Sequence, residues 1–342
     1  MKVTHLLILA LGFCAAFGGY LFFQKNKTVL RTAIPVQKKA KPLVVYAFEN
    51  LSKTEFKKSP VSLGEVLDET DYSYKQLFYF ATSSKPGLDP HLKSSGVANI
   101  PKSPGVYPVI LMFRGFIPED AYVPGAGTQR VAEVFAQNGF ITLAPDFLGF
   151  ADSAKPSADS FEARFQTYST ALSLIASLSG FQNAFAASYS GAIKPDISRI
   201  SIWGHSNGGH IALAVLSITG ASYRTVLWAP VAKPFPYSIL YYSDEFDDKG
   251  KAMRKVLSDF ESDYDVKYFS PDTYFSRIKA SIMIAQGSGD REVPYWWSEE
   301  LNETLKKEGQ PVTYNLYQGA DHNMLPDAWS KAVSDSVVFL RE

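Results

Sequence analysis

The sequence predicts an α/β fold in which a mostly parallel β-sheet is covered by helices on both faces. From residue 105 onward, short apolar segments of strand length alternate with longer segments of helical periodicity. The run Tyr107–Phe113 is apolar throughout, which is typical of a strand buried on both faces. Hydrophobic residues make up 46% of the 342 residues and charged residues 20%, so the chain can bury a sizeable core.

The predicted elements follow one another along the chain. Strands are predicted at Leu43–Phe48, Tyr74–Phe80, Tyr107–Phe113, Phe140–Ala144, Ile200–Trp203, Thr225–Trp228, Ser281–Ala285 and Val312–Tyr317. Helices are predicted at Gln129–Gln137, Phe161–Leu178, Gly208–Ile218, Trp297–Lys307 and Ala328–Leu340. Ligands of such a sheet bind beyond the carboxyl ends of its strands, so we expect the functional residues in the loops that follow them.

One segment, from Val231 to about Tyr274, interrupts this alternation. It is rich in aromatic and acidic residues, among them Tyr237, Tyr241 and Asp244. We predict that it forms a small helical cap over the site. The cap is then an insertion in a single catalytic domain of residues 42–342.

The amino terminus carries a long uncharged run, from Leu6 to Phe23, flanked by Lys2 and Lys25. A helix of this length spans roughly 27 Å, close to the thickness of the bilayer core. Residues 1–23 are therefore predicted to be an uncleaved membrane anchor. The competing interpretation is a signal peptide with Leu6–Phe13 as its apolar stretch, which is removed on secretion or export to the periplasm.

Both interpretations place the catalytic domain outside the cytoplasm. Residues 24–41 are polar and basic, and we predict a solvated linker between the membrane segment and the catalytic domain. The chain has 34 basic and 34 acidic side chains. This balance gives no field that would attract nucleic acid, which excludes a general nucleic-acid-binding role.

Cysteine usage limits the chemistry of the globular part. The one cysteine, Cys14, lies in the amino-terminal apolar segment. The rest of the chain can form neither disulfides nor a thiolate metal site.

The central motif is Gly204-His205-Ser206-Asn207-Gly208-Gly209. A five-residue G-x-S-x-G match is weak alone, but here a predicted strand ends at Trp203 and a helix begins just after Asn207. A sharp strand-to-helix turn holds such a serine in a strained, exposed position, and small glycines on either side avoid collision. Ser206 is the predicted nucleophile.

A serine hydroxyl needs a base to accept its proton. The chain has five histidines: His5, His91, His205, His210 and His322. His322 follows the last predicted strand, in a loop at that strand's carboxyl end, and is the predicted base. His205 adjoins the serine and is expected to point elsewhere, while His210 is expected to be a packing residue of the following helix.

The base in turn needs an acid that fixes its tautomer and stabilises the imidazolium. Asp290 follows the Ser281–Ala285 strand and is the predicted acid, with Glu292 as a rival two residues on. Asp321 ranks last because a side chain rarely reaches the ring of the next residue. Asp146 precedes the serine in the chain and is expected to be a structural turn residue.

Negative charge that develops on the substrate carbonyl oxygen needs fixed N–H donors. We expect one from the backbone of Asn207. The second is expected from the backbone of Phe116, in the loop after Phe113, because Gly115 lets the chain turn tightly beside the substrate.

These motifs resemble the catalytic domain of the prolyl oligopeptidase family of S9 serine peptidases. The resemblance runs from about Tyr107 to the C-terminus and rests on SRISIW leading into GHSNGG, on GSGDREVP and on GADHN. The same motifs occur in dienelactone-hydrolase-like and acyl esterases. The resemblance implies the α/β-hydrolase fold, with Ser206, Asp290 and His322 in that chain order as the catalytic triad.

Two features depart from that family. Its peptidases usually carry an amino-terminal β-propeller, for which the residues before Tyr107 are too few. Some members also supply a tyrosine hydroxyl near the positions of Phe113 and Arg114, and neither residue has one. Arg114 could contact a carboxylate of the substrate, but a surface ion pair is the favoured expectation.

The predicted function is that of a serine hydrolase that forms an acyl-enzyme and needs no metal or organic cofactor. The favoured substrates are short peptides, and a carboxylesterase or acyl esterase acting on small esters is the alternative. A third hypothesis is a binding protein on a catalytically dead hydrolase scaffold. The sequence leaves the oligomeric state open.

Overall fold

The computed structural model describes residues 40–342. Residues 42–342 form one compact unit, which contains the whole fold reported below. The predicted anchor or signal segment, residues 1–23, and the linker up to residue 39 lie outside the described residues. No helix within the described range has the length and apolar character needed to cross a membrane.

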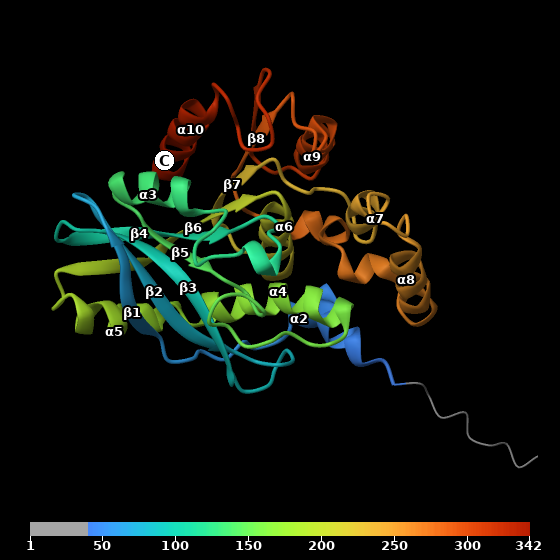
Figure 1. Ribbon diagram of the computed structural model, residues 1–342, viewed down its shortest axis with the longest axis horizontal. Coiled ribbons are helices and arrows are strands. Elements are labelled where there is room, and N and C mark those ends of the chain that lie inside the picture. The colour runs from blue at the N-terminus through green and yellow to red at the C-terminus, as the bar shows by residue number, and fades with distance from the viewer. Residues whose placement is uncertain (1–39) are drawn as a thin grey trace, which may run out of the picture. The chain divides into compact units, whose positions relative to one another are not determined.

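A nine-stranded sheet with the order β1-β2-β3-β5-β4-β6-β7-β8-β9 forms the centre of the described unit (Figure 1). The strands β5, β4, β6, β7, β8 and β9 pair in parallel, whereas β1, β2 and β3 are antiparallel, as is the β3–β5 pair. The prediction of a mostly parallel sheet is therefore confirmed. The strands are β1 Ser62–Glu69, β2 Ser73–Thr82, β3 Leu92–Pro101, β4 Gly105–Phe113, β5 Ile141–Pro145, β6 Ile193–His205, β7 Arg224–Trp228, β8 Ile282–Gly287 and β9 Val312–Tyr317.

Helices cover both faces of the sheet, with α3 and α10 on one face and α4 and α5 on the other (Figure 1). The α-helices are α2 Phe48–Leu51, α3 Gln129–Gln137, α4 Ser160–Ala176, α5 Leu178–Ser188, α6 Asn207–Thr219, α7 Tyr237–Ser243, α8 Lys251–Asp263, α9 Tyr295–Lys307 and α10 Trp329–Arg341. Short 3-10 helices are η2 Pro42–Tyr46, η3 Glu119–Ala121, η4 Val266–Phe269 and η5 Pro271–Arg277.

Strand β4 shows why its sequence is apolar throughout. Val109, Leu111 and Phe113 pack in the cluster that contains α4, α5 and α6. Ile110 and Met112 face the other way, into the cluster that contains α3 and α10. All five side chains are fully buried, and each contributes about 1.5–3 kcal/mol to the free energy of folding.

The strand predicted at Leu43–Phe48 is wrong, because this run forms η2 and the start of α2. Phe48 is fully buried and its ring lies 5.6 Å from both Tyr168 and Tyr274. Leu43, Tyr46 and Ala47 are buried as well, which is a helical rather than an alternating spacing. Tertiary aromatic packing therefore overrides the β-propensity of the valines in this run.

The long helix predicted over Phe161–Leu178 is two helices, α4 and α5, separated at Ser177. The segment predicted to be a cap contains α7, α8, η4 and η5. Phe260 and Phe269 of this segment belong to the main core cluster, so part of it packs on the body of the domain. That it covers the site remains a prediction.

Candidate active site

Ser206 lies between the last residue of β6 and the first residue of α6, at the carboxyl edge of the parallel strands. Its backbone has φ 56° and ψ −122°, a conformation that costs on the order of 1–3 kcal/mol for a residue with a side chain. Hydrogen bonds hold it there: its N–H donates to Trp228 at 2.9 Å, and its carbonyl accepts from Gly209 at 2.9 Å and Val231 at 3.0 Å. The turn is the strained elbow that the motif predicts.

Gly208 shows how closely this elbow packs. A Cβ atom at this position would lie 1.8 Å from the carbonyl oxygen of Phe113 at the end of β4. No side chain fits, because the first turn of α6 lies directly against the β4 backbone. The glycine therefore fixes the position of the serine relative to the neighbouring strand.

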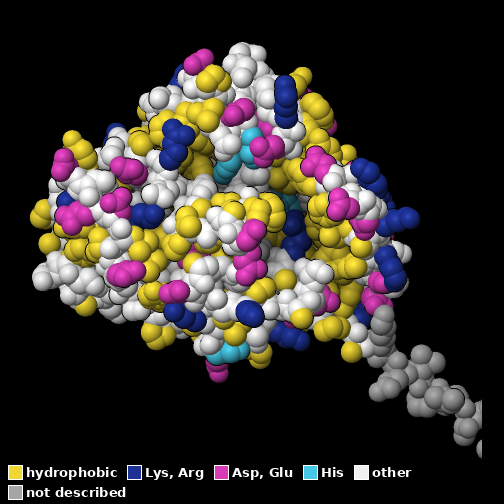
Figure 2. Space-filling view, viewed as in Figure 1, with side chains coloured by type: hydrophobic (Ala, Val, Ile, Leu, Met, Phe, Trp, Pro, Cys, Tyr) yellow, Lys and Arg dark blue, Asp and Glu magenta, His cyan; other side chains and the backbone are white. Residues whose placement is uncertain are grey.

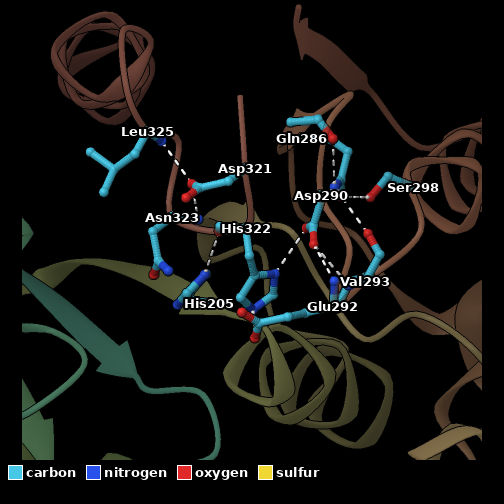
Figure 3. Close-up of polar contacts among 11 residues, drawn as sticks. His205, Gln286, Asp290, Glu292, Val293, Ser298, Asp321, His322, Asn323 and Leu325 are labelled. Carbon is cyan, nitrogen blue, oxygen red and sulfur yellow. Dashed lines mark hydrogen bonds and ion pairs between the residues drawn. The ribbon is translucent and has the colours of Figure 1, made fainter. Parts of the chain in front are cut away.

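His322 and Asp290 are in direct contact (Figure 3). The Nδ1 atom of His322 lies 2.8 Å from Oδ2 of Asp290, in the loops that follow β9 and β8. The Asp290 side chain is fully buried and that of His322 is 7% exposed. With Nδ1–H donating to the carboxylate, Nε2 is the ring nitrogen left to accept a proton.

The Asp290 carboxylate is held in its charged form. Burial alone would raise its pKa, but hydrogen bonds from His322 and from the backbone N–H groups of Val293 and Glu292 outweigh burial and lower the pKa below its ordinary value. The carboxylate is therefore a fixed negative charge beside the imidazole.

Two further side chains that the sequence analysis did not single out support this carboxylate. Gln286 Nε2 donates to Asp290 Oδ2 at 3.0 Å, and Ser298 Oγ donates to Gln286 Oε1 at 2.7 Å. Both residues are fully buried. The available signal was Gln286 itself, a polar residue close to the end of the apolar β8 strand.

His205 reaches the loop of His322, and its ring makes no hydrogen bond with Ser206 among the described residues. Its Nε2 atom lies 2.9 Å from the His322 carbonyl oxygen, and the two ring centroids are 4.6 Å apart. Burial and the neighbouring His322 lower the pKa of His205 to about 4, so its ring is neutral at physiological pH. His205 joins the elbow to the histidine loop.

The other acidic residues considered as partners of the base lie in different surroundings from Asp290. Glu292 is 68% exposed and lies 3.7 Å from the opposite ring nitrogen, Nε2. Asp321 binds the backbone N–H groups of Asn323 and Leu325 at 2.8 Å each, and so folds the loop. Asp146 is buried elsewhere and accepts hydrogen bonds from two hydroxyl groups.

The two predicted oxyanion donors flank Ser206. Asn207 is the first residue of α6, whose leading N–H groups have no partner within the helix. A Cβ atom on Gly115 would lie 3.0 Å from the Ser206 Cβ atom, so the loop that carries Phe116 passes beside the serine. Within residues 40–342, neither Phe116 N–H nor Ser206 Oγ makes a hydrogen bond.

Arg114 is not on the surface, which contradicts the expected surface ion pair. The residue is 6% exposed, and its guanidinium donates to the carbonyl oxygens of Gly115 and Asp146. Its charged head stacks against aromatic rings instead of pairing with a carboxylate among the described residues.

Aromatic side chains from α7 and α9 lie beside the acid loop. Tyr241 packs on Trp297 with a centroid distance of 4.7 Å and remains 38% exposed, and Tyr237 is 50% exposed. Trp297 clusters with Val231 and Val293. The Val231 N–H donates to the Ser206 carbonyl oxygen, and the Val293 N–H donates to the Asp290 carboxylate.

The aromatic side chains of α7 and α9 near this loop are called the aromatic wall, which consists of Tyr237, Tyr241, Tyr242 and Trp297. Figure 2 shows a hollow between histidine and acidic side chains and the hydrophobic side chains over α7.

The remaining histidine of the elbow helix is a packing residue, as expected. His210 is fully buried, with Nε2 3.0 Å from the Tyr168 hydroxyl and Nδ1 3.2 Å from the Val231 carbonyl oxygen. In the described part of the chain, no three His, Cys, Asp or Glu side chains gather in a way that could hold a metal ion.

Comparison with known families gives two matches. The model of the prolyl oligopeptidase family matches residues 181–342, which include Ser206, Asp290 and His322. The chlorophyllase model matches residues 74–227, which include Gly115 and Ser206.

Individual proteins agree with these matches. The chain is 27% identical over 241 residues to the Bacillus subtilis protein YtmA, described as an uncharacterized peptidase, covering 69% of this chain and 83% of that protein. It is 26% identical over 155 residues to a probable isoprenylcysteine alpha-carbonyl methylesterase of rice (Oryza sativa subsp. japonica), covering 41% of this chain and 37% of that protein.

Solved structures share the fold. An acetyl xylan esterase from Paenibacillus sp. R4 superimposes with a TM-score of 0.54 at 18% identity, covering 85% of this chain and 91% of the esterase. Dipeptidyl peptidase 4 of Porphyromonas gingivalis gives 0.50 at 20% identity, covering 79% of this chain and 35% of the peptidase.

Fold, site and relatives together define the class: the chain is an α/β-hydrolase and a serine hydrolase. Within that class it is similar both to the catalytic domain of prolyl oligopeptidases and to dienelactone-hydrolase-like esterases.

Proposed function

We propose that Ser206, His322 and Asp290 hydrolyse short peptides through an acyl-enzyme. The observation that carries the proposal is the buried 2.8 Å contact between His322 and Asp290, at the same sheet edge as the strained Ser206 elbow. A histidine held in this tautomer at the same sheet edge as a half-buried serine is the arrangement that activates a hydroxyl nucleophile.

The reaction has two halves. His322 Nε2 takes the proton of Ser206 Oγ as that oxygen attacks the substrate carbonyl carbon, and Asp290 stabilises the resulting imidazolium. The oxyanion accepts hydrogen bonds from the Asn207 and Phe116 N–H groups. His322 then protonates the leaving amine, and a water molecule, activated by the same nitrogen, releases the acyl group from Ser206.

Short peptides are favoured for two reasons. The prolyl oligopeptidase model matches the stretch that contains all three proposed catalytic residues, and the Bacillus subtilis relative, covered over 83% of its length, is described as an uncharacterized peptidase. The aromatic wall also offers exposed ring surface next to the acid loop, which suits an apolar side chain of a peptide.

A carboxylesterase or acyl esterase is the second candidate. The chlorophyllase match covers the Gly115 loop and the Ser206 elbow, and the rice relative is described as a methylesterase. The same triad chemistry serves an alcohol leaving group, so the distinction is one of substrate binding.

A substrate comparison tests the choice. Turnover of Gly-Pro and Ala-Pro p-nitroanilides is compared with that of p-nitrophenyl acetate and butyrate, using wild type and Ser206→Ala. We expect Ser206-dependent cleavage of the amides. Ser206-dependent cleavage of the esters with no amide turnover would favour the esterase, and turnover that Ser206→Ala retains would contradict the site.

We further propose that residues 1–23 tether the enzyme to a membrane with the catalytic domain outside the cytoplasm. The support is the uncharged run Leu6–Phe23 between lysines. Fractionation of full-length protein tests it: recovery with membranes, resistant to high salt, is expected. Release of a soluble, shortened chain would favour a cleaved signal.

A further inference from the structure

Arg114 occupies an unusual place for an arginine. It follows the last residue of β4, is 6% exposed and forms no ion pair with any described residue. Its guanidinium carbon lies 4.0 Å from the ring centre of Phe150 and 4.5 Å from that of Tyr122. Burial disfavours this charge and lowers the pKa of the guanidinium, and the attraction of the nearby Asp146 carboxylate only partly offsets that cost. Because apolar side chains can often replace a buried charge without loss of stability, a function explains the arginine better than stability does.

Two backbone carbonyls, and no carboxylate, take the hydrogen bonds of Arg114. Nη2 donates to the Asp146 carbonyl oxygen at 3.1 Å, and Nη1 donates to the Gly115 carbonyl oxygen at 3.0 Å. The nearby Asp146 carboxylate is occupied by the hydroxyl groups of Ser95 at 2.6 Å and Tyr122 at 2.5 Å. The arginine therefore joins the end of β4 to the loop after β5.

The hydrogen bond from Arg114 to the Gly115 carbonyl oxygen affects the predicted oxyanion donor, because both groups are part of one peptide. The Gly115 carbonyl and the Phe116 N–H belong to the same peptide, and this peptide is trans. In a trans peptide the two groups point in opposite directions, so fixing the carbonyl fixes the direction of the N–H. A charged donor on the carbonyl also polarises the amide and strengthens its N–H as a donor.

We propose that Arg114 is a positioning residue that clamps the Gly115–Phe116 peptide with its N–H directed at the oxyanion. This inference rests on the proposed function, since it assigns a role within the same acyl transfer. A flipped peptide would turn a carbonyl oxygen toward the developing negative charge. By holding the Gly115 carbonyl, Arg114 disfavours the flipped peptide. Its positive charge also lies close to the peptide that carries the Phe116 N–H donor.

Direct substrate binding by Arg114 is disfavoured by the same contacts. Both terminal nitrogens are engaged with backbone carbonyls, and Nε is buried without a hydrogen-bond partner in the described chain. Aromatic rings cover the planar surface of the guanidinium. The residue acts through the loop that it holds.

The test compares Arg114→Met, Arg114→Lys and Arg114→Ala with a control, Arg224→Met. Arg224 also donates to a backbone carbonyl, that of Phe339 at 3.1 Å, and lies 5.0 Å from a phenyl ring centre. It differs in forming an ion pair with Glu342, and it begins β7, away from the carboxyl ends of the strands where the site lies. Each variant is assayed for kcat and KM on a substrate that wild type turns over, and each is checked by thermal unfolding and circular dichroism.

We expect Arg114→Met to lower kcat by about 10²–10³-fold with KM changed less than about threefold, as for loss of one oxyanion donor. Arg114→Lys, which keeps the charge, should lose about tenfold. Added guanidinium at tens of millimolar should restore part of kcat in Arg114→Ala, which a purely structural role would not permit. Arg224→Met should keep kcat within about twofold.

Other outcomes overturn the proposal. Folded Arg114 variants with wild-type kcat would show that the clamp has no role in the reaction. A rise in KM confined to carboxylate-bearing substrates would assign Arg114 to substrate binding. If the variants unfold and guanidinium restores only their stability, the role is structural. Absence of Ser206-dependent turnover in wild type would instead refute the proposed function itself.

Discussion

The contact between His322 and Asp290 decides which of several acidic residues can orient the base. Asp290 bonds Nδ1 at 2.8 Å from a buried position, while the exposed Glu292 lies 3.7 Å from Nε2. Only the first geometry leaves Nε2 unprotonated and available to the serine.

Asp290→Asn is expected to keep the fold and lower kcat by about 10⁴-fold, because an amide favours the wrong histidine tautomer. Glu292→Gln, in the same loop, is the matched control and should change kcat less than about tenfold, as its charge is exposed. Steady-state kinetics decide the matter: a larger loss in the glutamate variant would make Glu292 the orienting acid.

Buried histidines should make stability depend on pH. Burial and the charge of Arg164 lower the pKa of His210 to about 3, so the folded chain keeps this ring neutral while the unfolded chain protonates it below about pH 6.5. The unfolded state binds the extra proton, so this contribution to stability is full above pH 6.5 and is lost as the pH falls toward 3.

The expected slope is about 1.4 kcal/mol per pH unit for each such histidine, in urea unfolding between pH 6 and 4. His205, whose pKa is lowered to about 4, contributes in the same direction. His210→Gln should reduce this slope by about 1.4 kcal/mol per pH unit, the contribution of one proton. An unchanged slope would mean that His210 is protonated in the folded state.

At the scale of elements, the junction of β4, β6 and α6 sets the position of the nucleophile. Gly208 allows the α6 backbone to touch β4, and a Cβ atom added at Gly115 would lie only 3.0 Å from the Ser206 Cβ atom. Both glycines are required by close approach of the backbone.

Gly208→Ala should therefore destabilise the protein by about 3 kcal/mol or more and lower kcat strongly, since its Cβ would lie 1.8 Å from the Phe113 oxygen. Gly309→Ala is a control with open space around it and a φ of 82°, where about 1 kcal/mol is expected. Urea unfolding measures both, and equal losses would contradict the packing described for the elbow.

The elements that could be predicted were those whose own sequence pattern shows which residues are buried. Strand β4 and the strands after it are short apolar runs, and most of them were located within a few residues. Strands β1 and β3 were missed because they are polar or contain glycine and serine, and pair in ways that only the neighbouring strands define. The Leu43–Phe48 run was misassigned because its fate depends on the ring of Tyr274, far along the chain.

At the scale of the whole described unit, parallel strands bring loops distant in sequence to one edge. This is why chain order and loop position were enough to propose Ser206, Asp290 and His322. The supports were not predictable in the same way. The role of Gln286, the contact of His205 with His322 and the burial of Arg114 each depend on atoms elsewhere in the chain, and no local pattern encodes them.

Covalent labelling by a fluorophosphonate, followed by intact-mass and peptide-mass measurement, tests the central claim most directly. We predict one adduct per folded chain, on the peptide that contains Ser206, with no adduct in Ser206→Ala and a greatly slowed reaction in His322→Gln. A folded wild-type chain that stays unlabelled, or an adduct on another residue, would contradict the assignment and favour a binding protein on a hydrolase scaffold.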